Sequence, residues 1–132
     1  MRSCMLRFLN RYFVHNDERG SIEGLINQGN WQELNLVTSE AGVVRGNHYH
    51  KTTHELFIVL EGEIEIQVQD IDNGNLTGSA STYRVKAGDV FLVEPMTNHI
   101  FTPQMFSTWI NALSVRMDKD HPDFHRTECP HA

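Results

Sequence analysis

The chain has 132 residues, of which 39% are hydrophobic and 21% charged, which is typical of one folded domain and excludes a disordered chain. The net charge of −6 at pH 7 argues against nucleic acid as a partner, because phosphate binding needs clustered Lys and Arg. The apolar runs are too short to cross a bilayer, and Arg2, Arg7 and Arg11 interrupt any N-terminal signal sequence. We therefore expect a cytoplasmic protein without a membrane partner.

The N-terminal segment 1–14 could form a short helix, because Leu6, Leu9 and Phe13 follow one another at helical spacing. The rest of the chain is divided by Gly, Asn and Asp into short segments rich in β-branched and aromatic residues, a pattern typical of an all-β domain. Strands are expected at 21–27, 32–38, 42–50, 55–61, 63–70, 82–86, 89–94, 98–103 and 107–116. So many short strands in this length indicate a small barrel or sandwich.

The two strands around Gly62 differ in pattern. Segment 55–61 is apolar on both faces, which predicts burial on both sides, whereas 63–70 alternates apolar and polar residues, so one face should meet water. Gly62 predicts a tight turn between them. Asp72-Asn73-Gly74 predicts a hairpin turn, and the polar residues from there to Ser81 predict a surface loop.

A cluster of metal-ligating residue types follows in the same region. His48 and His50 are two residues apart, so on a strand both imidazoles lie on one face. A turn at 51–53 would bring Glu55 close to both rings, and His99 is the best candidate for a fourth ligand. Three imidazoles and a carboxylate suit a divalent transition metal such as Zn, Fe, Mn, Ni or Cu, and do not select among them.

The alternative to a metal site is that the paired histidines are polar surface residues. His54 competes with Glu55 as a ligand, but strand alternation places it on the opposite face. The remaining histidines lie in polar segments and are expected at the surface; they are His15, His121, His125 and His131. Cys4 and Cys129 form no ligand pair and are expected to be reduced thiols.

The spacing G-x5-H-x-H-x4-E-x6-G, met by Gly42, His48, His50, Glu55 and Gly62, resembles the first motif of the cupins. Their second motif is matched loosely by Gly88, Pro95 and His99. The resemblance covers about residues 31–116 and implies a double-stranded β-helix, the cupin or jelly-roll barrel, with a metal at its inner end. Residues 1–132 would then be a single cupin domain, with a helix or strand extension over 1–30 and a polar tail over 117–132.

Two segments suggest a narrower resemblance, namely Asp17-Glu18-Arg19-Gly20 and 45–50, Arg-Gly-Asn-His-Tyr-His. They are similar to dTDP-4-dehydrorhamnose 3,5-epimerases, to sugar 3,4-ketoisomerases, and most of all to the C-terminal cupin of capsular-polysaccharide-assembling proteins. This implies a small-molecule substrate, a nucleotide-linked keto sugar of polysaccharide biosynthesis. The implied reaction is epimerisation or isomerisation by proton removal next to the ketone. Family resemblance also implies a homodimer, often formed by exchange of an N-terminal strand.

Under this resemblance His48 has two competing roles. In a metal-free site it matches the epimerase base, but a metal-bound ring nitrogen cannot accept a proton from substrate. Glu55 favours the metal, since the ketoisomerases carry Gln there. The region Phe101–Ile110, where the epimerases' catalytic tyrosine would fall, contains no Tyr, which counts against epimerase activity.

Two arginines and two phenylalanines are candidates for contacting the substrate. Arg45 could bind phosphate oxygens, as could Arg19, although either could instead pair with or brace its neighbours. Phe57 and Phe101 share strand parity with Glu55 and His99 and are expected to line the cavity. The sequence also leaves open a non-haem metal dioxygenase and a non-catalytic cupin that binds a small molecule, so enzyme activity itself stays an open question.

Overall fold

A computed structural model describes residues 6–127, and within that range the chain forms strands and turns without a helix. Cys4, Cys129 and His131 lie outside the described residues. The strands are β1 (Leu6–Phe8), β2 (Phe13–Asp17), β3 (Gly20–Gly24), β4 (Glu33–Ser39), β5 (Arg45–His48), β6 (Glu55–Glu61), β7 (Glu63–Asp72), β8 (Asn75–Lys86), β9 (Val90–Val93), β10 (Thr97–Pro103) and β11 (Ser107–Leu113). The all-β prediction is confirmed, and nothing in this range is a helix able to span a membrane.

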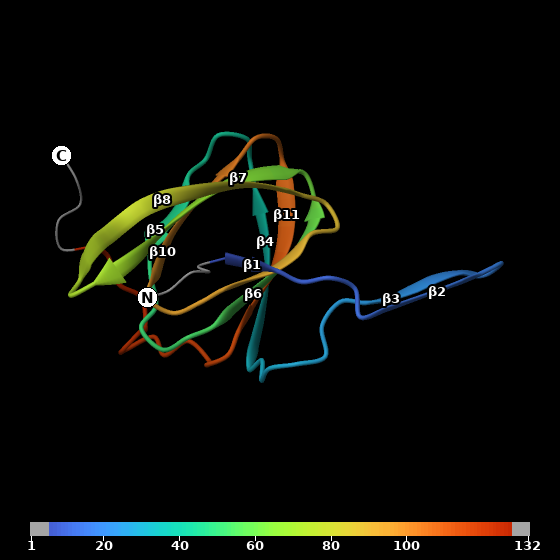
Figure 1. The fold of residues 1–132 in the computed structure, drawn as a ribbon, viewed down its shortest axis with the longest axis horizontal. Coiled ribbons are helices and arrows are strands. Elements are labelled where there is room, and N and C mark those ends of the chain that lie inside the picture. Colours follow the sequence, from blue (N-terminus) through green and yellow to red (C-terminus); the bar gives the residue numbers. More distant parts are fainter. Residues whose placement is uncertain (1–5, 128–132) are drawn as a thin grey trace.

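Most strands belong to two antiparallel sheets that pack face to face (Figure 1). One sheet has the order β1-β9-β6-β11-β4 and the other has the order β5-β10-β7-β8. Consecutive strands mostly lie in opposite sheets, so the chain crosses repeatedly between the two layers. The hairpin β2–β3, which we call the arm, projects from the barrel into solvent (Figure 1).

The main core lies between the two sheets. Ile64, Ile66 and Val68 of β7 are fully buried, whereas the residues between them are at least partly exposed, as the alternation predicted. Strand β6 is buried on both faces, because Phe57 faces the core and Leu56 packs in a second apolar cluster under the segment 25–31. The two-sided apolar pattern of β6 is therefore explained by this outer cover.

Two predicted elements are wrong. In place of a helix, the described part of 1–14 forms β1 and β2, and Leu6 pairs with Val93 on the edge of β9 and is 3% exposed. The polar residues before Ser81 are not a loop, because β8 begins at Asn75 and pairs with β7. Helical spacing and polar composition are local signals, and here pairing with a distant or neighbouring strand edge outweighs them.

The candidate metal centre and its cavity

Three of the candidate ligands lie on three different strands, and His50 follows two residues after the end of β5. His48 closes β5 and lies directly opposite His99 of β10 in the sheet, while Glu55 opens β6. The approach of β5 to β10 depends on Gly46, whose φ is +91° and where a Cβ atom would lie 2.7 Å from the carbonyl oxygen of His99. Only glycine fits at this position without strain.

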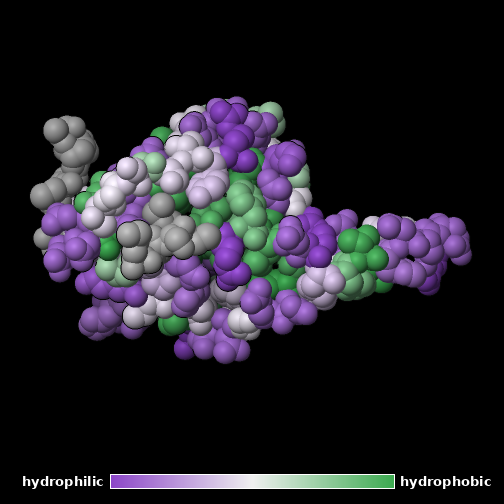
Figure 2. Space-filling model, viewed as in Figure 1, coloured by the Kyte–Doolittle hydropathy of each residue, from purple (hydrophilic) through white to green (hydrophobic). Residues whose placement is uncertain are grey.

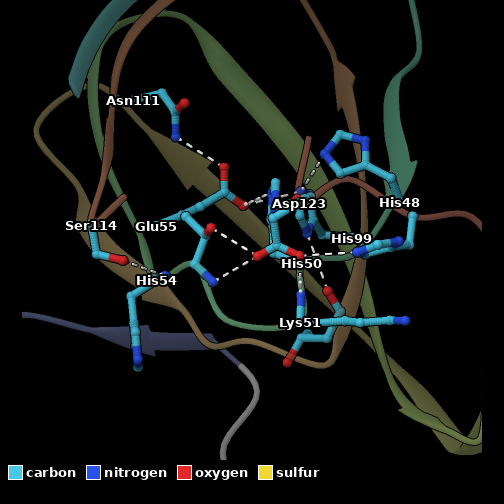
Figure 3. A network of polar contacts seen from close by, with 12 residues as sticks. His48, His50, Lys51, His54, Glu55, His99, Asn111, Ser114 and Asp123 are labelled. Atoms are coloured by element: carbon cyan, nitrogen blue, oxygen red, sulfur yellow. Dashed lines mark hydrogen bonds and ion pairs between the residues drawn. The ribbon is translucent and has the colours of Figure 1, made fainter. Parts of the chain in front are cut away.

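The side chains converge at the inner end of the barrel (Figure 3). The Nε2 atoms of His99 and His48 are 3.2 Å apart, and Glu55 Oε1 lies 3.2 Å from His50 Nε2 and 3.3 Å from His99 Nε2. The three histidines offer ligand atoms that all lie within 4.8 Å of one another. The His48, His50 and His99 cluster could hold a metal ion, with Glu55 beside it.

Two candidate ligand atoms of the cluster have no hydrogen-bond partner within residues 6–127, which is typical of atoms that bind a metal. Among the described residues, His50 Nε2 and Glu55 Oε1 are buried and make no hydrogen bond, although they face each other at ion-pair distance. Buried polar atoms nearly always have a partner. A cation would accept both lone pairs at once, and imidazole nitrogen with carboxylate oxygen is a common donor set for divalent transition metals.

Backbone carbonyls orient two of the rings. His99 Nδ1 donates to the carbonyl of Thr97 at 3.2 Å, and His50 Nδ1 donates to the carbonyl of Asp123. A neutral imidazole that donates from Nδ1 keeps a free lone pair on Nε2. Asn111 Nδ2 donates to Glu55 Oε2 at 3.1 Å, which leaves Oε1 toward the histidines.

Burial and mutual contact shift the pKa values in the cluster. Burial lowers the pKa of His48 to about 3 and also lowers the pKa of His99. Burial opposes the charge on Glu55, but the nearby imidazoles of His99 and His50 outweigh it and lower the pKa of the carboxyl to about 2. Burial also disfavours the charged form of His50, but the hydrogen bond and the negative charge of Glu55 outweigh burial, so the pKa of His50 is raised. Without a metal, burial thus favours the neutral rings of His48 and His99, whereas the ionised Glu55 favours a proton on His50.

A cavity of about 270 Å³ opens from this cluster. Its apolar wall includes Phe57, Phe101 and Trp109, and Glu33 and Asn35 of β4 contribute polar groups. Arg45 also borders the cavity, while its guanidinium donates to Ser39 Oγ and to the carbonyl of Thr38. Arg45 therefore braces the wall and borders the cavity at once.

Among the described residues outside the cluster, His54 and Arg19 pair with carboxylates away from the cavity, whereas His125 is not at the surface as expected. His54 is exposed and pairs with Glu94 at 3.1 Å, on the opposite face from Glu55. Arg19 pairs with Asp17 at 2.6 Å on the arm and does not line the cavity. His125 is half-buried, lies 3.0 Å from Asp123 Oδ1 and forms a β-bridge with Tyr49, so its expected surface position is wrong.

Sequence reasoning missed three residues around the site. Asn111 occupies an inward position of β11, and a polar residue at such a position is the signal that could have indicated it. Asp123 and Phe124 reach the site from beyond the last strand, within a stretch that reads only as a polar tail. No local pattern indicates that this stretch returns to the barrel.

Residues 15–120 match the model of the family described as the polysaccharide biosynthesis C-terminal domain. The chain belongs to this family. It is also 27% identical over 117 residues to the UDP-2-acetamido-2,6-beta-L-arabino-hexul-4-ose reductase of Pseudomonas aeruginosa, covering 83% of this chain and 30% of the reductase. The chain thus spans about a third of that relative.

Solved structures agree on the fold of this family member. The capsular polysaccharide assembling protein CapF of Staphylococcus aureus has a TM-score of 0.66 at 22% identity, over 88% of this chain and 32% of CapF. The dTDP-4-dehydrorhamnose 3,5-epimerase of Bacillus anthracis has a TM-score of 0.74 at 20% identity, over 92% and 79% of the two chains. The 3,4-ketoisomerase QdtA of Thermoanaerobacterium thermosaccharolyticum has a TM-score of 0.73 at 14% identity, over 96% and 90%. The predicted double-stranded β-helix is confirmed, because the chain shares the fold of these structures.

Proposed function

We propose that this domain binds a divalent transition metal through His48, His50, Glu55 and His99. We further propose that it acts on a nucleotide-linked keto sugar, as an epimerase or isomerase of polysaccharide biosynthesis. The observation that carries the proposal is the convergence of three imidazole nitrogens and one carboxylate oxygen at the end of an aromatic-walled cavity. When bound, the metal would supply a Lewis acid that polarises the sugar ketone.

The geometry favours His48 as a ligand over His48 as the base. Its Nε2 faces His99 Nε2 at 3.2 Å rather than standing free in the cavity. Burial lowers the pKa of His48 to about 3, and a group with so low a pKa is a weak proton acceptor near neutrality. The neutral ring that burial enforces is instead the form that a metal binds.

The cavity walls support a sugar nucleotide as the ligand. Phe57, Phe101 and Trp109 offer apolar faces for a ring, and Arg45 borders the cavity with a cation that could meet diphosphate oxygens. QdtA has been solved in complex with TDP-4-keto-6-deoxyglucose, and the Bacillus anthracis epimerase with TDP and PPi. CapF has been solved with the inhibitor 3-isopropenyl-tropolone.

A second candidate is a non-catalytic domain that binds the same class of ligand. The cavity-lining side chains between residues 6 and 127 include neither tyrosine nor lysine, so two common proton donors are missing from the wall. Binding without turnover would need only the metal, the aromatic wall and Arg45.

Metal content tests the site directly. The purified protein, reconstituted with Zn²⁺ and desalted, should retain about one equivalent by elemental analysis, and His48→Ala and His50→Ala should each lose it. His54→Ala is the matched control, because His54 is exposed and pairs with Glu94 outside the barrel. Unchanged metal content in the two cluster variants, or none in the wild type, would show that the metal assignment is wrong.

Activity is tested with nucleotide 4-keto sugars in D₂O. Metal-loaded wild-type protein should incorporate solvent deuterium next to the ketone, detected by mass spectrometry, and His50→Ala should not. Binding of the sugar nucleotide without deuterium uptake would favour the non-catalytic candidate. Oxygen consumption by the Fe(II)-loaded protein with these substrates would instead indicate a dioxygenase.

The arm supports the proposal of a homodimer. Phe13, Val14 and Ile22 on it are 44%, 52% and 60% exposed, and apolar atoms are visible on the projecting arm in Figure 2. Such a surface is costly to leave in water. Light scattering should give twice the monomer mass, and Ile22→Asp should shift the protein toward monomer; a monomeric wild type would refute the dimer.

A further inference from the structure

The segment 122–127, which we call the latch, folds back over the candidate metal centre after the last strand. Tyr49 and His125 exchange two backbone hydrogen bonds, of 2.9 and 3.0 Å. Tyr49 stands between His48 and His50 in the chain and is 3% exposed. The latch is therefore hydrogen-bonded to the backbone between two candidate ligands, and it lies beyond the family match, which ends at residue 120.

The carboxylate of Asp123 holds the turn that joins His50 to Glu55. Asp123 Oδ1 accepts from the backbone N–H of Lys51 at 2.8 Å. Oδ2 accepts from the backbone N–H groups of Thr52 and Thr53, both at 2.9 Å, and from their hydroxyls at 3.0 and 2.8 Å. One side chain thus satisfies five donors in three consecutive residues.

The backbone of the same residue orients a candidate ligand. The carbonyl of Asp123 accepts the Nδ1 hydrogen of His50, and the dashed lines of Figure 3 show Asp123 beside both the turn and the ring. Fixing the hydrogen on Nδ1 leaves His50 Nε2 as the free nitrogen, 3.2 Å from Glu55 Oε1. Asp123 therefore fixes the separation of His50 and Glu55 through the turn and the orientation of the His50 ring through its carbonyl.

The next latch residues cover the other side of the cluster. The Phe124 ring packs on His48 with centroids 4.2 Å apart and lines the cavity. The Arg126 guanidinium lies 5.6 Å from the Phe124 ring centroid and donates to the carbonyl of Asn47 at 3.0 Å. These contacts hold Phe124 against the histidine.

From these contacts we propose that Asp123 is the positioning residue of the metal centre, and that the latch encloses the site while Phe124 forms part of the substrate wall. This inference rests on the proposed metal-binding function and adds the element that organises it. Hydrogen-bonded partners behind metal ligands typically account for about 10–100-fold in metal affinity. Without Asp123, the turn at 51–53 would lose its shared acceptor, and His50 and Glu55 would lose their fixed separation.

The first experiment measures Co²⁺ affinity of the full chain by competition with a chromophoric chelator. Asp123→Asn should bind Co²⁺ about 10–100-fold more weakly than wild type. The amide nitrogen of Asn is a donor, so it cannot accept the N–H and O–H groups of the 51–53 turn that the carboxylate accepts. At saturating Co²⁺ the absorption bands of this variant should also shift, as a change in ligand geometry requires and a mere loss of stability does not. Asp118→Asn is the matched control, since Asp118 is an exposed carboxylate that borders the same surface cavity as Asp123 and, among residues 6–127, bonds to Asp120 and His121.

Thr52→Ala provides a milder variant if Asp123→Asn fails to fold. It removes one hydroxyl bond to Asp123 at an exposed position, and a few-fold loss of Co²⁺ affinity is expected. Phe124→Ala should retain most of the metal affinity but bind a nucleotide diphosphate sugar more weakly. Wild-type affinity in both Asp123→Asn and Thr52→Ala would overturn the positioning role.

A metal-free readout separates this inference from the proposed function. Long-range ¹H–¹⁵N correlation of the imidazoles, recorded above neutral pH with chelator, should show the His50 hydrogen on Nδ1 in wild type. The Nδ1 signal should shift in Asp123→Asn, because loss of the side-chain bonds to the turn displaces the Asp123 carbonyl that accepts this hydrogen. If wild type binds no metal but shows this difference, the metal function fails and the positioning of His50 stands. Identical His50 signals in both proteins would overturn the inference, whatever the metal result.

Discussion

Acid should destabilise the metal-free protein through His48. Burial holds the pKa of His48 at about 3 in the folded state, against 6.5 as its ordinary value. The folded pKa is the lower one, so the unfolded chain binds the proton more tightly. The stability that depends on a neutral His48 is fully present above pH 6.5, and the unfolding free energy falls as the pH drops toward 3. Each pH unit in this window costs about 1.4 kcal/mol of unfolding free energy, so about 2 kcal/mol is lost by pH 5 and about 4 kcal/mol by pH 3.

The other histidines of the cluster act in both directions. His99, whose pKa is also lowered, adds to the loss in acid, whereas His50, whose pKa is raised, contributes stability that is present at low pH and lost as the pH rises through its folded value. A comparison of variants therefore isolates His48. Urea unfolding in the presence of chelator, at about pH 7 and about pH 5, should show a drop in His48→Gln that is about 2 kcal/mol smaller than in wild type.

Val59→Ala serves as the control for the acid experiment. Val59 is 2% exposed in the core, so the substitution lowers stability without removing a titrating group, and its drop between the two pH values should equal that of wild type. Equal drops in wild type and His48→Gln would refute the reasoning, because the folded pKa of His48 would then not be depressed.

Four further predictions follow from the packing and the ligand set. Gly62→Ala should cost about 1–3 kcal/mol in urea unfolding, because φ is +96° and the new Cβ would lie 2.1 Å from Ser107 Oγ; an unchanged midpoint would contradict this. Phe57→Ala should lower the unfolding free energy by about 3–5 kcal/mol, because the ring is 4% exposed and stacked on Phe91. Thermal unfolding measures this loss, and a loss below about 1 kcal/mol would mean that neighbouring side chains move in to fill the cavity. Glu55→Gln should weaken metal binding by at least about tenfold in calorimetry, and an unchanged Kd would remove Glu55 from the ligand set. Metal at about 100 times its Kd should raise the unfolding free energy by about 2.7 kcal/mol, and a melting temperature insensitive to chelator would argue against a bound metal.

Much of the β architecture and of the ligand set follows from local patterns. Alternation in β7 indicated its buried face, and Asn73-Gly74 indicated the hairpin turn, where both residues have positive φ. The spacing of His48, His50 and Glu55 indicated side chains that the structure brings together with His99. These signals work because the pleat repeats every two residues, so position along a strand determines which face a side chain occupies.

Only the tertiary structure decided the strand pairings and hydrogen bonds between residues that are far apart in the chain. Leu6 joins β9 across most of the sequence, and His50 meets Asp123 across 73 positions. No local pattern encodes such pairings, since they follow from which strand edge is free and which acceptor lies beside an unsatisfied donor after folding. The sequence by itself therefore determined the candidate ligand types and their face of the barrel, whereas only the folded chain decided how the candidate ligands are held and which segment packs over them.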